Sequence, residues 1–433
     1  MKSLFLDIGE LAHMVHPESD GALRGSQMSD RDALVVDPGC AILVEDGRIS
    51  KITDSDSMRD EFSIPKSGTR RVHQAIHGSL AVWHCSGLSM TPGFIDSHAH
   101  LVWAGDRSHE ATLRKQGLTY QQIADQGGGI GFTVNQTKES SFDSLVELTS
   151  RRLGVARRNG TVAIESKSGY GLSTEAELKI LEVSNHISEG SPLEISHTWL
   201  GAHAVPADMD QAEFVDYLIS DQLPEVVSQG IATSCDVFCE VGWFTVEETE
   251  RICLAAKEEG LDIRLHVDEF QDSGGAQLAA DLGARSADHA GWSDEEAREN
   301  CTKAGVNQGF LPGTPYVLGS DHWPPMREAV EKEWIWSLAS DYNPNCQSLS
   351  LPFAGSLAMH RCGISALEAL TAVTVNAAAT LDSNTPCIGT IQEGGLASFN
   401  LLSTERVDGW CQTPGQSSVV LNTIRGQTQQ YVM

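Results

Sequence analysis

Two histidines, His98 and His100, stand two positions apart at the end of the segment "TPGFIDSHAH". In a β-strand, the side chains at positions i and i+2 point to the same face, so both imidazoles can reach one ion. Neutral imidazole is a good ligand for zinc, iron and similar divalent metals. Two histidines hydrogen-bonded in a polar loop are the alternative, but the position of the pair at the end of a strand after "TPGFID" favours a metal site.

Two further residues with metal-binding side chains follow apolar runs later in the chain. His266 lies in "IRLHVDEF" and Asp341 lies in "SLASDYNP". Together with His98 and His100 they give a mixed nitrogen and oxygen ligand set that leaves room for a water molecule. We therefore predict one divalent metal ion, which would lower the pKa of its bound water to about 7 and polarise a substrate carbonyl. Asp341 would then accept a proton from that water.

Other polar residues at similar positions predict contacts with the reacting groups. His289 in "SADHAG" can hydrogen-bond the water or a developing oxyanion, although a histidine satisfied in the wall of the fold is an equal alternative. Arg107 in "WAGDR" can bind a carboxylate through two parallel bonds, and its alternative is a surface salt bridge. Tyr170 in "KSGYGL", His203 in "GAHAVP" and Glu269 in "HVDEF" complete the candidates for substrate contacts.

The segments that carry these residues alternate between strand-like and helix-like patterns. Residues 160–166 are followed by a helical stretch at 173–188, and residues 261–270 by one at 274–284. Repeated βα units predict a parallel sheet with right-handed crossovers. The polar residues fall at the carboxyl ends of the strands, where a (β/α)8 TIM-like barrel has its active site. The alternative, a doubly wound open sheet, calls for a glycine-rich phosphate turn where this chain has His98-Ala99-His100.

Both ends of the chain are rich in short β segments and turns. Asp46-Gly47 between apolar residues predicts a β-hairpin in the N-terminal part. We expect residues 1–90 and 386–433 to form one small β-sandwich domain beside a barrel of residues 91–385.

Composition and charge restrict the function. The chain has 433 residues, of which 40% are hydrophobic, so a large core can form. Its net charge of -29 argues against nucleic acid and anionic membranes as partners. There is no apolar stretch of the roughly 20 residues that a membrane span needs, and no cleavage site near the N-terminus, so we expect a cytoplasmic protein. An anionic substrate would be repelled by the overall field and therefore requires a specific cation in the pocket.

These motifs together resemble the amidohydrolase superfamily and, within it, the imidazolonepropionase family. The resemblance runs from about residue 92 to residue 380. It is carried by the segments "PGFIDSHAHLVWAGDR", "QGGGI", "KSGYGL", "GAHAVP", "DVFCEVGWFTVEET", "HVDEF", "SADH", "LPGTPYVLG", "SDYNP" and "AVTVNAA". The His-x-His pair and the late aspartate mark the superfamily, whereas "KSGYGL", "GAHA" and the arginine after "AG" are more particular to the family.

The resemblance implies hydrolysis of the cyclic amide of 4-imidazolone-5-propanoate to N-formimino-L-glutamate, in histidine degradation. It further implies one zinc or iron ion and a homodimer. It implies metal ligands at His98, His100, His266 and Asp341, catalytic roles for Asp341, His289 and Glu269, and substrate contacts at Arg107, Tyr170, His203, Glu269, Asn343, Asn345 and Cys346. At Asn345 and Cys346 the family usually has glycine and a small hydroxyl residue, so the shape of the pocket differs there. Near the C-terminus, "LASFNLL" replaces the usual Ala-Asp-Leu.

Two other functions stay open at this point. One is a related amidohydrolase that acts on another cyclic amide or deaminates a nucleobase-like ring, for which a carboxylate-binding Arg107 would have no use. The other is a non-catalytic binding protein that has kept the barrel, which the presence of all four predicted ligands disfavours.

Overall fold

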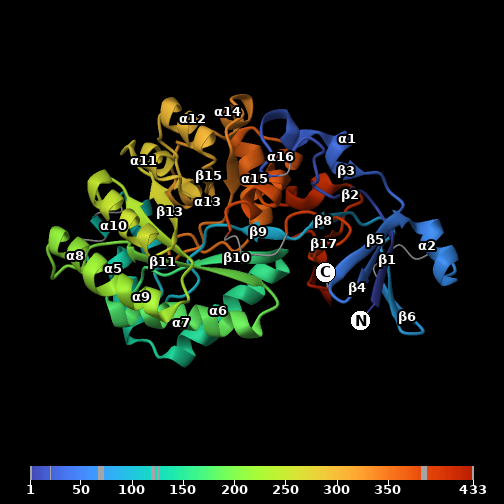
Figure 1. Ribbon diagram of the computed structural model, residues 1–433, viewed down its shortest axis with the longest axis horizontal. Coiled ribbons are helices and arrows are strands. Elements are labelled where there is room, and N and C mark those ends of the chain that lie inside the picture. The colour runs from blue at the N-terminus through green and yellow to red at the C-terminus, as the bar shows by residue number, and fades with distance from the viewer. Residues whose placement is uncertain are drawn as a thin grey trace.

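Eight parallel strands form the centre of the molecule in the computed structural model (Figure 1). The structure describes residues 2–19, 21–66, 73–118, 122–123, 126–381 and 388–431. Each strand pairs with the next one along the chain, and all seven pairings are parallel. The strands are β9 (Phe94–Asp96), β10 (Thr161–Lys167), β11 (Glu194–Ala202), β12 (Ser234–Cys239), β13 (Asp262–Val267), β14 (Ser286–His289), β15 (Asn307–Phe310) and β16 (Trp336–Leu338). This order confirms the predicted (β/α)8 TIM-like barrel and excludes the doubly wound sheet.

The first and last strands meet and close the barrel at the carboxyl end of β9. A parallel bridge joins Ala99 to Tyr342, just beyond the ends of β9 and β16. The backbone N–H of Asp341 donates to the carbonyl of His98 at 3.1 Å. Two of the predicted metal ligands are therefore joined by the backbone bond that closes the barrel.

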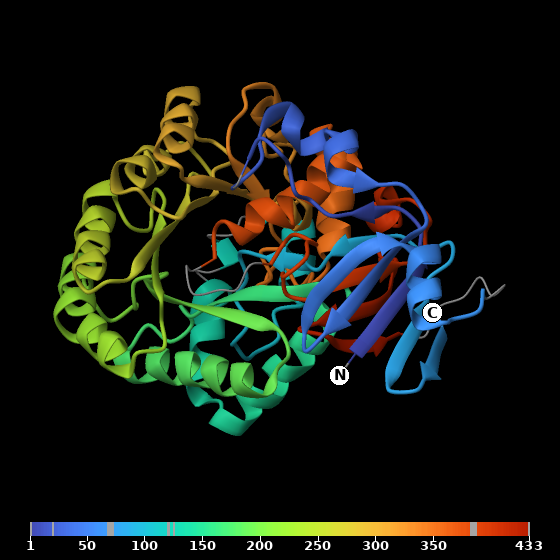
Figure 2. The same ribbon diagram turned by 45° about the vertical axis from the view of Figure 1, so that its right-hand side comes forward.

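Helices surround the barrel on its outside (Figure 2). They are α6 (Phe142–Arg158), α7 (Thr174–Gly190), α9 (Leu223–Gln229), α10 (Val246–Glu258), α11 (Gly275–Leu282), α12 (Glu295–Ala304), α14 (Met326–Glu331), α15 (Leu351–Cys362), α16 (Ala366–Ala372) and α17 (Val375–Ala378). Local sequence fixes where they begin and end: α10 starts at a capping box, in which Thr245 and Glu248 each accept a hydrogen bond from the backbone of the other. Further helices lie in the loops at the carboxyl ends of the strands, namely α3 (Glu110–Lys115), α5 (Gly129–Glu139), α8 (Gln211–Tyr217) and α13 (Gly313–Leu318).

Two further sheets pack beside the barrel and combine both ends of the chain. The five-stranded sheet has the order β5-β4-β1-β7-β6, and the six-stranded sheet has the order β19-β18-β17-β8-β2-β3. Their strands are β1 (Lys2–Ile8), β2 (Leu11–Ala12), β3 (Val35–Val36), β4 (Cys40–Glu45), β5 (Arg48–Asp54), β6 (His73–His77), β7 (Leu80–His84), β8 (Met90–Pro92), β17 (Phe399–Leu402), β18 (Val419–Ile424) and β19 (Gln427–Gln430). In the six-stranded sheet, β17 from the C-terminal part pairs directly with β8 from the N-terminal part.

Alternating side chains explain how these sheets pack. In β1, Phe5 faces the six-stranded sheet and meets Phe399 of β17 edge-on, with ring centroids 5.0 Å apart. Its neighbours Leu4 and Leu6 face the other way, toward a cluster that includes Met58 of α2 (Ser55–Phe62). The expected sandwich of both chain ends is thus present.

The predicted hairpin connects β4 and β5. Asp46 and Gly47 have φ angles of 49° and 81°, the left-handed conformation that a two-residue hairpin turn requires at both positions. The predicted boundary at residue 386 lies outside the described residues, and the boundary at residue 90 stays a prediction. None of the helices in the described part is both long and apolar enough to span a membrane.

Candidate active site

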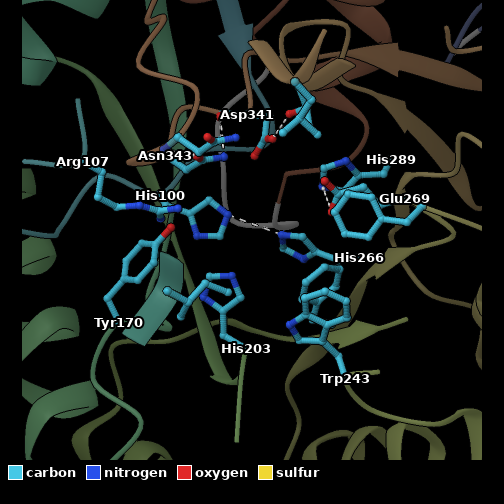
Figure 3. A pocket seen from close by; sticks show the side chains of 16 residues that line it. His100, Arg107, Tyr170, His203, Trp243, His266, Glu269, His289, Asp341 and Asn343 are labelled. Atoms are coloured by element: carbon cyan, nitrogen blue, oxygen red, sulfur yellow. Dashed lines mark hydrogen bonds and ion pairs between the residues drawn. The ribbon is translucent and has the colours of Figure 1, made fainter. Parts of the chain in front are cut away.

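A cavity opens at the carboxyl ends of the barrel strands, and its walls hold most of the predicted site residues (Figure 3). Each comes from a strand end or from the loop that follows it, as a barrel active site requires. The predicted residues that line the cavity are His100, Arg107, Tyr170, His203, His266, Glu269, His289, Asp341, Asn343 and Asn345. His98 and Cys346 are buried and do not line the cavity.

The four predicted metal ligands lie close together: His100, His266 and Asp341 line the cavity, and His98 is buried beside them. The Nε2 atoms of His100 and His266 are 3.4 Å apart, and His98 Nε2 lies 3.6 Å from Asp341 Oδ1. Ligand atoms of His98, His100 and Asp341 all lie within 4.8 Å of one another. His98 Nε2 is buried and has no hydrogen-bond partner among the described residues. A buried lone pair of this kind fits a metal ion, because leaving it without any partner would cost free energy.

Two carboxylates turn the histidines toward the metal position. His98 Nδ1 lies 2.8 Å from Asp288 Oδ2, and His266 Nδ1 lies 3.0 Å from Asp236 Oδ2. A carboxylate that accepts the Nδ1 proton fixes the ring orientation and leaves Nε2 as the metal ligand. The arrangement therefore supports the sequence-based ligand set on an independent structural ground.

A buried set of charges lies beneath the two carboxylates. Lys167 Nζ is 2.5 Å from Asp236 Oδ2, 3.0 Å from Glu165 and 3.6 Å from Asp288, and its side chain is fully buried. Arg264 Nε lies 3.0 Å from Glu165. These charged residues were not among the predicted site residues. A signal was present, since Glu165 and Lys167 are charged residues two positions apart in the otherwise uncharged strand β10.

Burial keeps four histidines of the site, His98, His100, His203 and His289, in their neutral form. It lowers the pKa of His98, His100 and His289 well below the usual value, and the positive charges nearby act in the same direction. Burial also lowers the pKa of His203 to about 3. Neutral imidazoles retain the lone pair that a metal ion or a hydrogen-bond donor needs.

The carboxyl groups in the cavity have the opposite shift. Burial raises the pKa of Asp341 and raises that of Glu269 well above its usual value, with the charge of Asp341 adding to the second effect. The Thr314 hydroxyl donates to Asp341 Oδ2, and Glu269 Oε2 lies 3.7 Å from His289 Nε2. Asp341 and His289 also have positive φ angles, 50° and 67°, an unfavourable backbone conformation that is common at functional sites. The site can therefore hold and transfer protons close to the metal ligands.

Arg107 lies at one end of the cavity and is buried, so the alternative of a surface salt bridge is wrong. Its guanidinium donates two bonds to Glu110, at 2.9 Å and 2.8 Å, and the backbone N–H of Gly129 donates to the same carboxylate at 2.8 Å. Figure 3 shows Tyr170 with its hydroxyl end turned toward Arg107. The role of Glu110 was not foreseen, although its place three residues after Arg107 near a helix start is a usable signal.

The loop after β16 forms the adjacent wall. Asn343 donates through Nδ2 to the carbonyl of Asp341 at 3.0 Å. Its Oδ1 accepts from the backbone N–H groups of Asn345 and Cys346, at 2.8 Å and 2.9 Å. The Cys346 thiol is buried behind this loop, 3.8 Å from the Ser340 carbonyl, so no substrate contact of its side chain follows from the structure.

Aromatic residues line the remaining walls. His203 stacks on His100 with ring centroids 5.2 Å apart and an interplanar angle of 16°, and its Nδ1 bonds the Gly169 carbonyl at 3.0 Å. Phe238, Trp243 and Phe270, which the sequence analysis did not name, also line the cavity. The cavity thus combines a flat aromatic side, a cation at one end and a cluster of metal ligands.

The chain is similar in sequence to proteins of known family. Residues 225–409 match the family described as "Amidohydrolase family". The chain is 39% identical to an imidazolonepropionase of Symbiobacterium thermophilum over 405 residues, which is 93% of this chain and 91% of that protein. It is 41% identical to an imidazolonepropionase of Shewanella sediminis over 75% of this chain and 80% of that one. A third, from Alkaliphilus metalliredigens, is 35% identical over 94% and 92% of the two chains.

Solved structures with the same fold have much lower sequence identity. An adenosine deaminase from Xanthomonas campestris with bound zinc has a TM-score of 0.68 and 14% identity, with 99% of this chain and 92% of that chain covered. A 5-methylcytosine deaminase from Klebsiella pneumoniae has a TM-score of 0.69 and 14% identity, with 100% and 99% covered. At this identity the likeness supports the fold alone.

Proposed function

This chain belongs to the imidazolonepropionase family of amidohydrolases, and we propose that it hydrolyses 4-imidazolone-5-propanoate to N-formimino-L-glutamate, a step of histidine degradation. The observation that carries this proposal is the pairing of two features in one cavity. The ligand atoms of His98, His100 and Asp341 lie within 4.8 Å of one another, and the Arg107 guanidinium lines the same cavity. A ring amide and a carboxylate on a short arm are the two groups that such a cavity would bind.

The metal ion in this proposal is a single zinc or iron, held by His98, His100, His266 and Asp341. When bound, the ion would activate a water molecule and polarise the carbonyl of the substrate ring. The neutral histidines and the orientation of His98 and His266 by carboxylates support this ligand set. Zinc and iron share these ligands, so elemental analysis of purified protein is the measurement that separates them.

Asp341 and His289 would handle the protons and charge of the reaction. Asp341 would accept a proton from the attacking water and pass it to the ring nitrogen, which leaves as the C–N bond of the amide breaks. His289, neutral because it is buried, would donate a hydrogen bond to the developing oxyanion or orient the water. Since one water is consumed and the ring opens, the reaction releases no second product.

The remaining polar residues would hold the substrate. Arg107 and Tyr170 would bind the propanoate carboxylate, because an arginine pairs with a carboxylate through two bonds. Glu269, whose raised pKa favours the protonated form, and His203, whose pKa is about 3, would hydrogen-bond the ring. Asn343 and the loop that it holds, including Asn345, would form the wall beside the substrate.

The direct test is turnover by metal-loaded protein. Purified enzyme with zinc or iron should remove the ultraviolet absorbance of 4-imidazolone-5-propanoate and yield N-formimino-L-glutamate without ammonia. Release of ammonia from a nucleobase-like ring, with no turnover of the imidazolone, would instead support a deaminase. Cleavage of other cyclic amides alone would contradict the substrate but leave the reaction class intact.

Two predictions from the sequence are independent of the chemistry. We propose a homodimer, which light scattering of the purified protein tests through its molar mass. A cytoplasmic location also stays a prediction, and cell fractionation tests it.

A further inference from the structure

Arg114, a residue of helix α3 that does not line the cavity, contacts Asn345 on one side and Glu110 on the other, at the end of the cavity where Arg107 lies. Its Nη1 donates to Asn345 Oδ1 at 2.8 Å and lies 3.8 Å from Glu110 Oε2. Asn345 and Arg107 both line the cavity. Arg114 therefore connects Asn345, 231 positions further along the chain, to the Glu110 carboxylate that holds Arg107.

The net charge at this end of the cavity depends on Arg114. Arg107 alone would give this end of the cavity one positive charge. However, Glu110 is almost fully buried and bonds Arg107 through both carboxylate oxygens, which neutralises that charge. Arg114, with a side chain only 16% exposed, restores a net charge of +1 for the set of three. This matters in a chain whose overall charge of -29 repels anions.

We propose that Arg114 is a specificity-determining residue, which makes this end of the cavity select a substrate with a single carboxylate. The inference rests on the proposed function, because it assumes that the carboxylate of the substrate binds beside Arg107. Arg114 would act through the field of its charge and through its bond to Asn345. It is a positioning residue and takes no part in the bond-breaking step.

The Asn345 contact gives a physical reason for one departure from the family pattern. A glycine at this position has no side chain to accept a bond from Arg114, whereas the Asn345 amide accepts one at 2.8 Å. The backbone N–H of Asn345 is held by Asn343, so the loop is fixed on two sides. In this chain the loop after β16 is therefore coupled to helix α3. The width of the cavity at the end where Arg107 lies depends on both elements.

The test compares metal-loaded wild type with Arg114→Gln and Arg114→Lys, using an anionic ligand and its neutral counterpart. The ligands are 3-(imidazol-4-yl)propanoate and its primary amide, tested as inhibitors, together with kcat and KM for 4-imidazolone-5-propanoate. For Arg114→Gln we expect KM and the inhibition constant of the anion to rise about tenfold, with the amide constant and kcat within about twofold of wild type. Arg114→Lys, which keeps the charge, should recover most of the loss. Arg151→Gln is the matched control, since Arg151 pairs with Glu147 on the exposed face of α6.

Two outcomes would overturn the proposal. One is an unchanged ratio of anion to amide binding in Arg114→Gln, and the other is an equal loss for both ligands, which indicates structural damage only. If Arg114→Gln folds poorly, Arg114→Met removes the same charge and keeps the apolar stem. A wild type that neither turns over the imidazolone nor binds either inhibitor would instead contradict the proposed function, so the two failures are distinguishable.

Discussion

His98 Nδ1 lies 2.8 Å from Asp288 Oδ2, and the opposite ring nitrogen of His98 lies 3.6 Å from Asp341. The buried Asp288 thus holds a predicted metal ligand in the orientation that metal binding needs. His266 has the same relationship with Asp236.

The first prediction concerns Asp288. An Asp288→Asn variant should bind the metal about 10- to 100-fold more weakly, because the amide cannot hold the His98 ring as the carboxylate does. Competition with a chelator measures this change, and circular dichroism checks that the fold is retained. Asp262→Asn is the control, since Asp262 pairs with Arg285 at the amino-terminal ends of strands β13 and β14, away from the site. A metal affinity within threefold of wild type would remove Asp288 from the site.

The second prediction concerns removal of the metal. A ligand that binds only the folded state stabilises it, by about 2.7 kcal/mol at a free concentration 100 times the dissociation constant. Chelation should therefore lower the melting temperature of the wild type, and added metal should restore it. His266→Ala should show little of this response, whereas His360→Ala, changed at an exposed position at the end of α15, should respond like the wild type. An equal metal response in His266→Ala would exclude His266 as a ligand.

The third prediction concerns Arg107. Arg107→Gln should raise KM for the anionic substrate by at least about thirtyfold, since truncating one partner of a buried charge pair costs 2 kcal/mol or more. Steady-state kinetics measure the effect, with Arg251→Gln as a control on an exposed pair with Asp216. An unchanged KM would favour a neutral substrate and hence the deaminase alternative.

The fourth prediction concerns Glu110 and pH. Burial alone would raise the pKa of Glu110, but the bonds from Arg107 and from the Gly129 N–H outweigh it and lower the pKa. A carboxylate with a lowered pKa adds stability that is present above its unfolded value, near 4.3, and is lost as the pH falls through the folded value. Wild type should therefore melt above Glu110→Gln at pH 6 to 8, and the gap should narrow below about pH 4. A gap that stays constant with pH would show that charge plays no part.

The fifth prediction concerns packing at the start of the barrel. A Cβ on Gly93 would lie 2.1 Å from Val162 Cγ1, and the β-branched Val162 has little freedom to move away. Gly93→Ala should therefore destabilise the fold by about 1–3 kcal/mol in denaturant unfolding. Gly154→Ala is the matched control: it lies inside α6 with open space around its Cβ, and should stabilise the protein by about 0.5–1 kcal/mol. Equal effects of the two substitutions would contradict this account.

The barrel could be predicted from the sequence, and so could the face on which the proposed ligands lie, because both follow from local patterns. Strand and helix periodicity identified the βα units, and the end of each strand marked the face of the barrel where His98, His266 and Asp341 lie. The position of Glu110 between two arginines depends on how α3 folds back against the start of α5 at Gly129, which the spacing of Glu110 from Arg107 alone does not reveal.

The buried charge cluster around Lys167 could not be predicted without knowing which strands of the barrel lie close together. Lys167 contacts Asp236 and Asp288, which lie on two other strands of the barrel. Only the curvature of the barrel brings these strands close to the same lysine. Cys346 illustrates the opposite limit. Its position in the loop suggested a contact with substrate, but the bonds of Asn343 turn the loop so that the thiol is buried.

The seam between β9 and β16 has a consequence for how the protein acquires its ion during synthesis. Asp96 and Ser340 are bonded across this seam although 244 positions separate them, and the proposed ligands His98 and Asp341 lie just beyond them. During synthesis, His98 and His100 leave the ribosome long before the last barrel strand. Until Asp341 follows, these two histidines lack their aspartate partner. With the proposed ligand set, complete metal binding is thus a late event, and any fragment that ends before β16 lacks both Asp341 and the edge that closes the barrel.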